Sequence, residues 1–303
     1  MTNQKPKIAI FFGGKISRHL RLIKEAAEKL SVDLDLVSYN QVRFDTKDKT
    51  VWIGDKIADD YDVLFFRTTG KHWEEVNLVI DSLIRKDVII VDPLVRLGAP
   101  SRTCKAHQMV ELAKAGIGVP VSIYGSLKYL RDNAGAKFGF PLIIKGSAGD
   151  RGTRVFKADN QDQLNQLFTQ LRPSEIKEGR RYLAQEFIDN DGDYRLIVLG
   201  DKVLGVMKRF RTEKGEFRNN FSCGGEVKVT DLPDELKDLA IKASRVCQLL
   251  IAGVDIVLRN GDPQQPIIWE VNKTPQFTGF MKATGIDVPR EIVKFLLSLC
   301  PQK

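Results

Sequence analysis

Short apolar runs and segments with helical spacing alternate over the start of the chain. Residues 6–14, PKIAIFFGG, form an apolar run that ends in a glycine turn, and residues 16–30 then place apolar side chains at helical spacing. A second apolar run at 61–70 precedes a helical pattern at 73–86. Such strand–helix alternation is typical of a parallel sheet with helices on its faces. We therefore predict a small α/β domain at residues 1–100.

The pattern changes after about residue 120, where strand pairs replace the strand–helix alternation. Residues 181–188, 193–210 and 252–272 are rich in strand-forming residues, and the Gly-Asp pair inside 193–210 is a hairpin signal. Helical patterns lie between these strands. Strands joined by short turns pair antiparallel. We therefore expect an α+β fold at residues 101–303, so that the whole chain is α/β and then α+β.

The composition is that of an ordinary globular protein and argues against several special classes. Of the 303 residues, 43% are hydrophobic and 28% charged, and no apolar run approaches the ~20 residues that cross a bilayer. The first residues lack the pattern of a secretory signal, and the four cysteines form no CxxC pair. We expect a cytoplasmic protein with neither a disulfide framework nor a zinc site, and with no membrane partner.

The net charge of +8 is spread along the whole chain. A basic protein can bind nucleic acid, acidic protein tails or polyphosphate nucleotides. The sequence contains no long basic tract and no repeat that alternates aromatic with basic residues. Nucleic-acid binding is therefore not expected.

A glycine-rich loop follows the predicted strand that ends at Lys145. The loop contains Gly146, Gly149 and Gly152. Glycine lets backbone N–H groups approach phosphate oxygens closely, and a lysine at the end of the strand adds a positive charge. A glycine-rich hairpin without any ligand would have the same pattern, and the P-loop motif GxxxxGK[ST] is absent.

Two further segments carry polar side chains at the ends of predicted strands. In the first, Glu186 and Phe187 end a strand, and the carboxylate of Asp193 follows the next turn. Free backbone groups there could pair with an adenine edge, and the carboxylate could reach a ribose hydroxyl. In the second, Arg209 lies on a strand before a glycine turn, and residues 218–220, RNN, follow the turn. Arginine suits phosphate and carboxylate binding, although charged hairpin tips are common.

Three oxygen-bearing side chains accompany the last two predicted strands. Glu270 and Asn272 are two residues apart, so on a regular strand they point to one face, while Trp269 and Val271 point to the other. If the strand that contains Asp255 pairs antiparallel with this one, Asp255 lies near Glu270. Three hard oxygen donors would suit Mg²⁺ that is bound partly through phosphates. A shift of one residue in the register would send Asp255 to the opposite face.

Taken in this order, the motifs resemble the ATP-grasp superfamily, and within it the RimK-like carboxylate–amine ligases. The resemblance is close over about residues 90–300 and looser before them. The segments that carry it are CKAHQMVELAKAGIGVP, FPLIIKGSAGDRG, AQEFI, GDYRLIVLGDKVLGVMKR, GEFRNNFSCGG, AGVDIVLR, WEVNKTPQFTGF and TGIDV. It implies a Rossmann-like pre-ATP-grasp domain at 1–100 and an ATP-grasp domain at 101–303, whose two α+β subdomains enclose ATP. Residues 122–187 would form a mobile lid over the nucleotide.

The resemblance also implies a role for each polar segment. The residues at the phosphates would be Lys105, Lys145, Gly149 and Gly152, the last two in a mobile loop. The residues around adenine and ribose would be Glu186, Phe187 and Asp193, and Arg218, Asn219 and Asn220 would complete the nucleotide contacts. The site would hold two ions of Mg²⁺ or Mn²⁺, and the ligands would be Asp255, Glu270 and Asn272. Arg209 would stabilise the charge that develops on the reacting carboxylate and phosphate.

The function implied by the resemblance is that of an ATP-dependent ligase that forms an amide or peptide bond. A carboxylate, from a small molecule or a peptide, would attack the γ-phosphate and release ADP. An amine, from an amino acid or a peptide, would then attack the acylphosphate and release phosphate. A homo-oligomer is compatible with the resemblance. Two other interpretations stay open: a small-molecule kinase that needs no amine, and a nucleotide-binding protein that no longer turns over.

Two stretches depart from the pattern of the family. Lys273 directly follows Asn272, and Thr278 stands in the loop where the family's namesake has an acidic residue, so glutamate addition does not simply carry over. Arg67, at the end of a predicted strand in the first domain, could bind a substrate carboxylate or could be a surface arginine.

Overall fold

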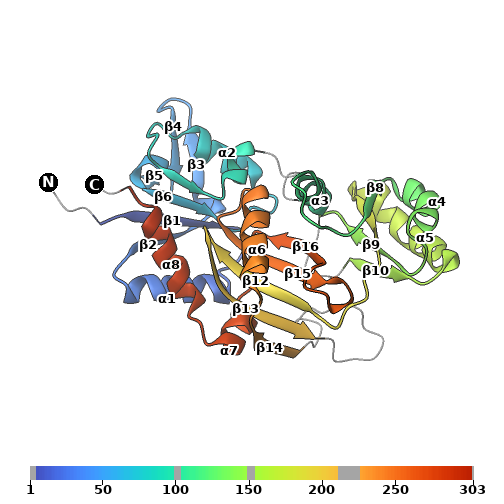
Figure 1. The fold of residues 1–303 in the computed structure, drawn as a ribbon. Helices are drawn as coiled ribbons and strands as arrows, with labels where there is room; N and C mark the ends of the chain where they lie inside the picture. Colours follow the sequence, from blue (N-terminus) through green and yellow to red (C-terminus); the bar gives the residue numbers. More distant parts are fainter. Residues whose placement is uncertain (1–4, 99–103, 149–153, 211–225, 302–303) are drawn as a thin grey trace.

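The structure is a computed structural model that describes residues 5–98, 104–148, 154–210 and 226–301. Its elements form three main bodies (Figure 1). A parallel sheet with its helices lies at one end, an antiparallel five-stranded sheet lies in the middle, and an antiparallel four-stranded sheet lies at the other end. The last helix of the chain returns to the first sheet, so the chain begins and ends at the same side of the molecule.

The first sheet is parallel and has the strand order β2-β1-β6-β7. Its strands and flanking helices are β1 (Lys7–Phe12), α1 (Arg18–Lys29), β2 (Asp33–Ser38), β6 (Val63–Phe66), α2 (Trp73–Asp81) and β7 (Ile89–Val91). Ile8 and Ile10 of β1 face α1, whereas Ala9 and Phe11 face α2. The alternation of side chains along β1 therefore places one helix on each face, as the sequence pattern predicts.

A small antiparallel sheet, with the order β3-β4-β5, is an addition that the sequence pattern did not indicate. Its strands are β3 (Val42–Asp45), β4 (Thr50–Ile53) and β5 (Lys56–Ile57). Short 3-10 helices occur at η1 (Tyr39–Gln41), η2 (Ala58–Asp60), η3 (Pro93–Leu97) and η6 (Arg259–Gly261). Most residues of these three strands are exposed or half-buried, so they lack the apolar alternation from which a strand can be recognised.

The four-stranded antiparallel sheet has the order β10-β9-β11-β8. Its elements are β8 (Ser122–Gly125), α4 (Leu127–Phe138), β9 (Leu142–Gly146), β10 (Val155–Ala158), α5 (Gln161–Glu178) and β11 (Tyr182–Glu186). Tyr182 and Ala184 of β11 pack under α4 and α5 in a core of their own. Leu183 belongs instead to the core of the five-stranded sheet. One face of this sheet thus carries its helices, and the other face is turned toward the five-stranded sheet.

The five-stranded sheet is antiparallel and has the order β14-β13-β12-β15-β16. Its elements are β12 (Asp193–Leu199), β13 (Lys202–Phe210), β14 (Glu226–Thr230), α6 (Asp234–Val246), β15 (Ile251–Leu258) and β16 (Pro266–Asn272). Apolar side chains of α6, among them Leu236 and Ala240, pack on Val254 and Ile256 of β15 and cover one face of the sheet. On the opposite face, Ile197, Met207 and Ile251 belong to a core that also contains Phe280 and Ile292.

The first sheet and the five-stranded sheet share one core. The remaining helices are α3 (Lys105–Lys114), α7 (Thr278–Thr284) and α8 (Val288–Leu299). Ile292 of α8 and Ile23 of α1 belong to a core that also contains Ile197 of β12 and Ile251 of β15. The domain boundary at about residue 100 and the lid at 122–187 stay predictions.

The order of the elements confirms the predicted fold class. A parallel α/β start is followed by two antiparallel sheets with helices. Among the described residues, none of the helices combines the length and the apolar character that a membrane span requires.

Candidate active site

Asp255 on β15 and Glu270 on β16 lie directly opposite each other across two antiparallel strands. This register is the one on which the metal-site prediction depends. Asn272 reaches the same place, because its Nδ2 lies 3.4 Å from Asp255 Oδ2. Val254 and Val271 pack on the α6 side of the sheet. The three oxygen-bearing side chains therefore meet on the face turned away from α6.

A bulge at Trp269 changes one detail of the prediction. Glu270 pairs with Asp255, and Ile268 pairs with the next residue of β15, so Trp269 is an extra residue in β16. Ile268 and Val271 pack in the core under α6, whereas Trp269 packs in a separate cluster. The expectation that Trp269 points the same way as Val271 is therefore wrong. The extra residue breaks the alternation and turns Trp269 to the side of Glu270.

Two arginines hold the carboxylate of Asp255. Arg195 on β12 donates to both of its oxygens, and Arg195 Nη2 lies 2.7 Å from Asp255 Oδ2. Arg209 on β13 lies 3.0 Å from the same oxygen and also pairs with Asp193, which is directly opposite on β12. All four side chains belong to residues that are at most 9% exposed. They form a buried network of two arginines and two carboxylates.

The network shifts the pKa values of its two carboxyls in opposite directions. Burial alone would raise the pKa of Asp255, but Arg195 and Arg209 hold it below its usual value. Burial raises the pKa of Asp193, because the attraction of Arg209 does not offset the complete loss of water around it. Burial lowers the pKa of Arg209, but its two carboxylates more than reverse this effect. Asp255 therefore stays a carboxylate and Arg209 stays a cation.

Two lysines reach the same cluster from outside the five-stranded sheet. Lys105, the first residue of α3, is ion-paired with Glu270. Lys145 on β9 lies with its Nζ 5.4 Å from the ring centre of Trp269. The backbone N–H of Lys105 donates to the carbonyl oxygen of Ser147 at 2.9 Å, which ties the start of α3 to the end of β9. Burial lowers the pKa of Lys145 to about 8, although Glu270 opposes this shift.

Glu186 and Phe187, predicted to lie against adenine, are at the end of β11. Glu186 Oε1 accepts a hydrogen bond from Val121 N at 2.9 Å and pairs with Arg259 Nη2 at 2.6 Å. The ring of Phe187 lies 5.0 Å from Lys157 Nζ. The side chain of Glu186 thus ties the start of β8 and η6 to β11. Contact of these two residues with adenine stays a prediction.

Gln185 lies on the same face of β11 as Leu183 and carries a free amide oxygen. Gln185 Nε2 donates to Ser122 Oγ at 2.8 Å, and Ser122 Oγ donates to the carbonyl oxygen of Pro120 at 2.7 Å. Because the single hydroxyl hydrogen of Ser122 goes to Pro120, Ser122 must accept from the amide nitrogen, which fixes the orientation of the amide. Gln185 Oε1 is buried and has no hydrogen-bond partner among the described residues.

Several predicted site residues take positions that the sequence did not indicate. Asp193, predicted at the ribose, is fully buried against Arg209. Arg67 is 2% exposed, so the interpretation of this residue as a surface arginine is wrong. Thr278 Oγ1 lies 3.1 Å from His19 Nε2 of α1. The predicted residues outside the described part of the chain are Gly149, Gly152, Arg218, Asn219 and Asn220.

The donor set fits a hard divalent cation. Carboxylate and amide oxygens are the ligands that Mg²⁺ takes in proteins, and Asp255, Glu270 and Asn272 supply them from neighbouring strands. Within the described ranges, no metal site could be built from three or more His, Cys, Asp and Glu side chains alone. The third donor here is an amide, and Lys105 and Arg195 neutralise the two carboxylates.

Arg195, Gln185 and Arg259 were missed by the sequence reasoning. Arg195 had a usable signal, because it is two residues from Asp193 and therefore shares its face of the strand. Gln185 also had one, since it is a polar residue directly after the apolar Leu183 and Ala184 of the predicted strand. Arg259 had none, because its partner Glu186 lies 73 residues away in the sequence.

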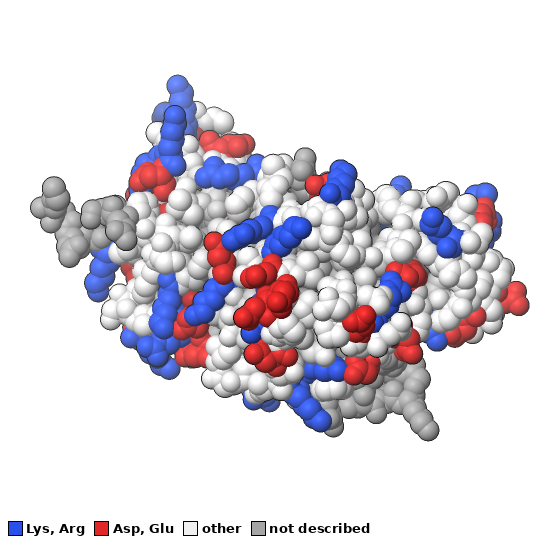
Figure 2. Space-filling model, in the orientation of Figure 1, with Lys and Arg blue, Asp and Glu red and all other residues white. Residues whose placement is uncertain are grey.

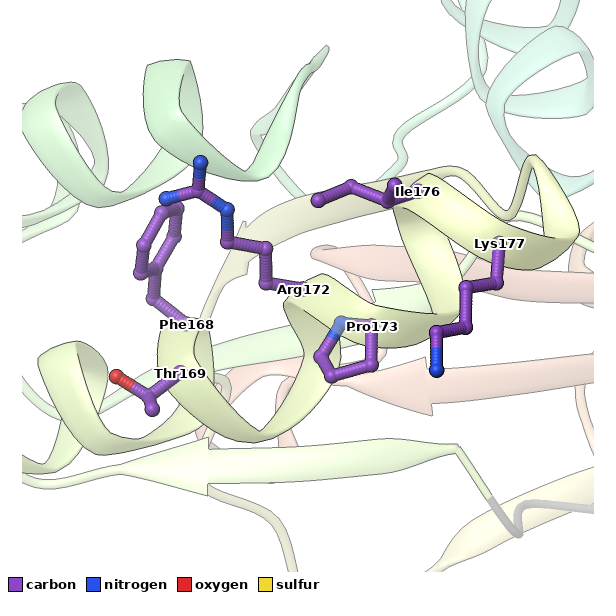
Figure 3. A pocket seen from close by; sticks show the side chains of 6 residues that line it. All are labelled: Phe168, Thr169, Arg172, Pro173, Ile176 and Lys177. Atoms are coloured by element: carbon purple, nitrogen blue, oxygen red, sulfur yellow. The ribbon is translucent and has the colours of Figure 1, made fainter.

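A pocket of about 400 Å³ lies elsewhere, on the outer four-stranded body (Figure 3). Its lining residues all belong to α5 and are Phe168, Thr169, Arg172, Pro173, Ile176 and Lys177. None of the charged residues that meet at Asp255 takes part in it. On the face shown in Figure 2, Lys and Arg side chains are interspersed with Asp and Glu rather than gathered in one basic band.

Comparisons with known proteins agree with the fold described above. Residues 102–296 match the RimK-like ATP-grasp domain. A probable alpha-L-glutamate ligase of Syntrophotalea carbinolica is 35% identical over 195 residues, which are 63% of this chain and 62% of that protein, less than two thirds of its length. Probable alpha-L-glutamate ligase 1 of Hahella chejuensis is 29% identical over 96% of this chain and 94% of its own.

A solved structure shares the fold over nearly the whole chain. It is that of the ATP-grasp ligase PsnB complexed with a phosphomimetic variant of a minimal precursor, Mg and ADP. The two chains are 18% identical and superpose with a TM-score of 0.74 over 98% of this chain and 99% of PsnB. The resemblance inferred from the sequence motifs is confirmed by the domain match. This chain belongs to the family of proteins with a RimK-like ATP-grasp domain.

Proposed function

We propose that the protein is an ATP- and Mg²⁺-dependent ligase that joins a carboxylate to an amine through an acylphosphate. The observation that carries this proposal is the meeting of Asp255 and Glu270 with Lys105 and Lys145 between two antiparallel sheets. Hard oxygen donors beside two lysines suit a divalent cation and a triphosphate. The cluster contains no paired nucleophile and base, and none is needed for phosphoryl transfer to a substrate carboxylate.

Each charged group of the cluster would have one task. Lys105 and Lys145 would bind the phosphates, and Lys105 would leave Glu270 as the nucleotide binds. Asp255, Glu270 and Asn272 would hold Mg²⁺, which withdraws negative charge from the phosphates when it is bound. The Mn²⁺ alternative and the presence of two ions belong to the same proposal. Arg209, fixed by Asp193, would neutralise the charge that develops on the transferring phosphoryl group.

The reaction would proceed in two displacements. In the first, a carboxylate oxygen of the substrate forms a bond to the γ-phosphorus, and the bond to ADP breaks. In the second, the amine nitrogen forms a bond to the carbonyl carbon, and phosphate leaves with the electron pair of the C–O bond. The amine loses its proton, so the product is a neutral amide. Enclosure between the two sheets would keep water from the acylphosphate.

The adenine would lie between the two antiparallel sheets, near the end of β11. Gln185 Oε1 is a buried acceptor on the same face of β11 as Leu183 and would accept a hydrogen bond from the adenine amino group. A guanine would present a carbonyl oxygen at the same place, which the amide oxygen would repel. Gln185 would thus favour ATP over GTP.

The substrates are proposed by class. The relatives from Syntrophotalea and Hahella are named probable glutamate ligases, which supports an amino acid as one substrate. PsnB was solved with a minimal precursor, which supports a peptide as the possible carboxylate donor. A screen for ADP release, with amino acids and short acidic peptides offered in pairs, tests the function. Mass spectrometry should find a product lighter than the two substrates by one water. ADP release with a phosphorylated product and no need for an amine would identify a kinase instead.

A further inference from the structure

Three charged side chains lie together beside the proposed metal site. Arg67 follows β6, Asp92 follows β7, and Lys273 follows β16. The carboxyl ends of the parallel strands β6 and β7 meet at one edge of the first sheet. Thr274 Oγ1 donates to the carbonyl oxygen of Arg67 at 2.6 Å, which brings the loop after β16 to that edge. We refer to Arg67, Asp92 and Lys273 as the edge cluster.

Each member of the edge cluster keeps one polar atom without a partner. Arg67 Nη2 donates to the carbonyl oxygen of Pro275 at 3.1 Å, but its Nη1 has no hydrogen-bond partner among the described residues. Asp92 Oδ1 accepts a hydrogen bond from Leu250 N at 2.8 Å, whereas its Oδ2 has no hydrogen-bond partner among the described residues. The Nζ of Lys273 is also buried and without a partner in the described part of the chain. One end of Arg67 and of Asp92 is thus anchored, and the other end is free.

The three charges stop short of forming ion pairs. Asp92 interacts electrostatically with both Lys273 and Arg67. No nitrogen of either residue comes within the 4.0 Å of a salt bridge to Asp92, as far as the described residues show. Buried opposite charges normally close into hydrogen-bonded pairs, because an unpaired buried charge is strongly unfavourable. The three side chains therefore keep polar atoms that a further polar group could satisfy.

The backbone and the surroundings of the edge cluster point the same way. Asp92 has a left-handed conformation with a φ of 62°, which is strained for a residue with a side chain. Arg67 lies over the ring of Phe277, with its Cζ 5.6 Å from the ring centre. Lys273 Nζ lies 5.9 Å from the ring centre of Trp73. Both rings belong to the neighbouring hydrophobic cores, so they hold the two cations in fixed places beside the strained backbone of Asp92.

We propose that the edge cluster binds the α-carboxylate and the α-amino group of a free amino acid, which is the amine substrate of the ligase. The carboxylate would lie between Arg67 and Lys273, and the nitrogen at Asp92. Two cations and one anion match the charge pattern of an amino acid, with the excess cation shared by the carboxylate. This inference rests on the proposed ligase function.

The position of Lys273 fits the role of an amine site. It directly follows Asn272, a proposed metal ligand, and Asp92 contacts the start of β15, the strand that carries Asp255, so an amino acid held by the edge cluster would lie in the neighbourhood of the proposed metal site. An amine without an α-carboxylate, such as an internal lysine of a peptide, would leave Arg67 and Lys273 unpaired. Because unpaired buried donors are unfavourable, the site would reject such an amine.

The test measures binding to the full chain in the presence of Mg²⁺ and ADP. Isothermal titration with the twenty amino acids, one at a time, identifies the best binder. Its α-carboxamide and its N-acetyl derivative then serve as probes of the unchanged protein. We expect each modification to weaken binding about tenfold or more. Failure of all twenty to bind, or equal binding of both derivatives, would overturn the proposal.

Variants separate a binding site from a structural link between the domains. Lys273→Met and Asp92→Asn should each weaken amino-acid binding about tenfold or more. ADP affinity should not change. The matched control Lys282→Met removes an exposed lysine of α7 and should leave both affinities unchanged. Variants that lose thermal stability but keep the amino-acid affinity would show a structural link and overturn the proposal.

The outcomes also separate this proposal from the ligase function. If the amino acid binds through the edge cluster but no carboxylate leads to ADP release, the amino-acid site is supported and the ligase function is contradicted. If a simple alkylamine supports full ADP release, and Lys273→Met does not change the rate of that release, the ligase function is supported and the amino-acid site is contradicted.

Discussion

Arg209 on β13 lies directly opposite Asp193 on β12, and both side chains are buried in one ion pair. Arg209 also contacts Asp255, which the proposed function assigns to the metal. The guanidinium group is therefore held on two sides by carboxylates. In the proposed function, a guanidinium group held in this way would neutralise the charge of the transferring phosphoryl group without having to reorganise.

Removal of Arg195 should destabilise the protein. Arg195→Gln leaves Asp255 buried with Arg209 as its remaining cation, and breaking a buried ion pair costs about 3 kcal/mol. Urea denaturation followed by circular dichroism measures the loss. Arg245→Gln, which breaks an exposed pair with Asp201, is the control and should cost below about 1 kcal/mol. Equal losses in the two variants would argue against a special role of the buried network.

Glu270→Ala should abolish ADP formation without unfolding the protein. Glu270 is half-buried and has Lys105 as its ion-pair partner, so its loss removes a proposed metal ligand while the strand pairing is kept. We expect a decrease in the rate of ADP release of about hundredfold or more. Glu291→Ala, on α8, is the control. A Glu270→Ala variant that turns over normally would remove the metal assignment.

ATP affinity should fall as the pH rises above 8. Burial lowers the pKa of Lys145 to about 8, so the free protein holds this charge below pH 8 and loses it above. Phosphates favour the charged form and raise its pKa, so above pH 8 binding must take up a proton. Affinity then falls up to about tenfold per pH unit. Calorimetry at several pH values measures this slope.

Lys145→Arg provides the matched control for the pH dependence. Arginine keeps its charge over the whole range, so the slope above pH 8 should flatten in this variant. The same slope in both proteins would show that another group takes up the proton.

Gln185→Leu should reduce the preference for ATP over GTP. The substitution keeps the size of the side chain but removes the buried acceptor Oε1, and the expected loss of ATP affinity is about tenfold. GTP affinity should not fall. Ser122→Ala frees the amide to rotate and should give an intermediate loss. An unchanged ratio of the two affinities would place the adenine elsewhere.

The sequence by itself determined the strand patterns and the order of the motifs. The alternation of side chains in a strand placed Glu270 and Asn272 on one face. The pairing with Asp255 was a hypothesis whose register the sequence left open and the structure confirms. These properties depend on neighbours in the chain. The local periodicity therefore predicted the fold class and the donors of the proposed metal site.

Only the tertiary structure decided which charges meet. The bulge at Trp269, the pairing of Arg195 with Asp255, and the approach of Lys273 to Asp92 join residues that are far apart in the sequence or break the strand period. Burial also excluded one of the two interpretations of Arg67, that of a surface arginine, because this side chain is buried and donates to Pro275. Contacts of this kind depend on how whole sheets pack against each other. No local pattern of residues encodes them.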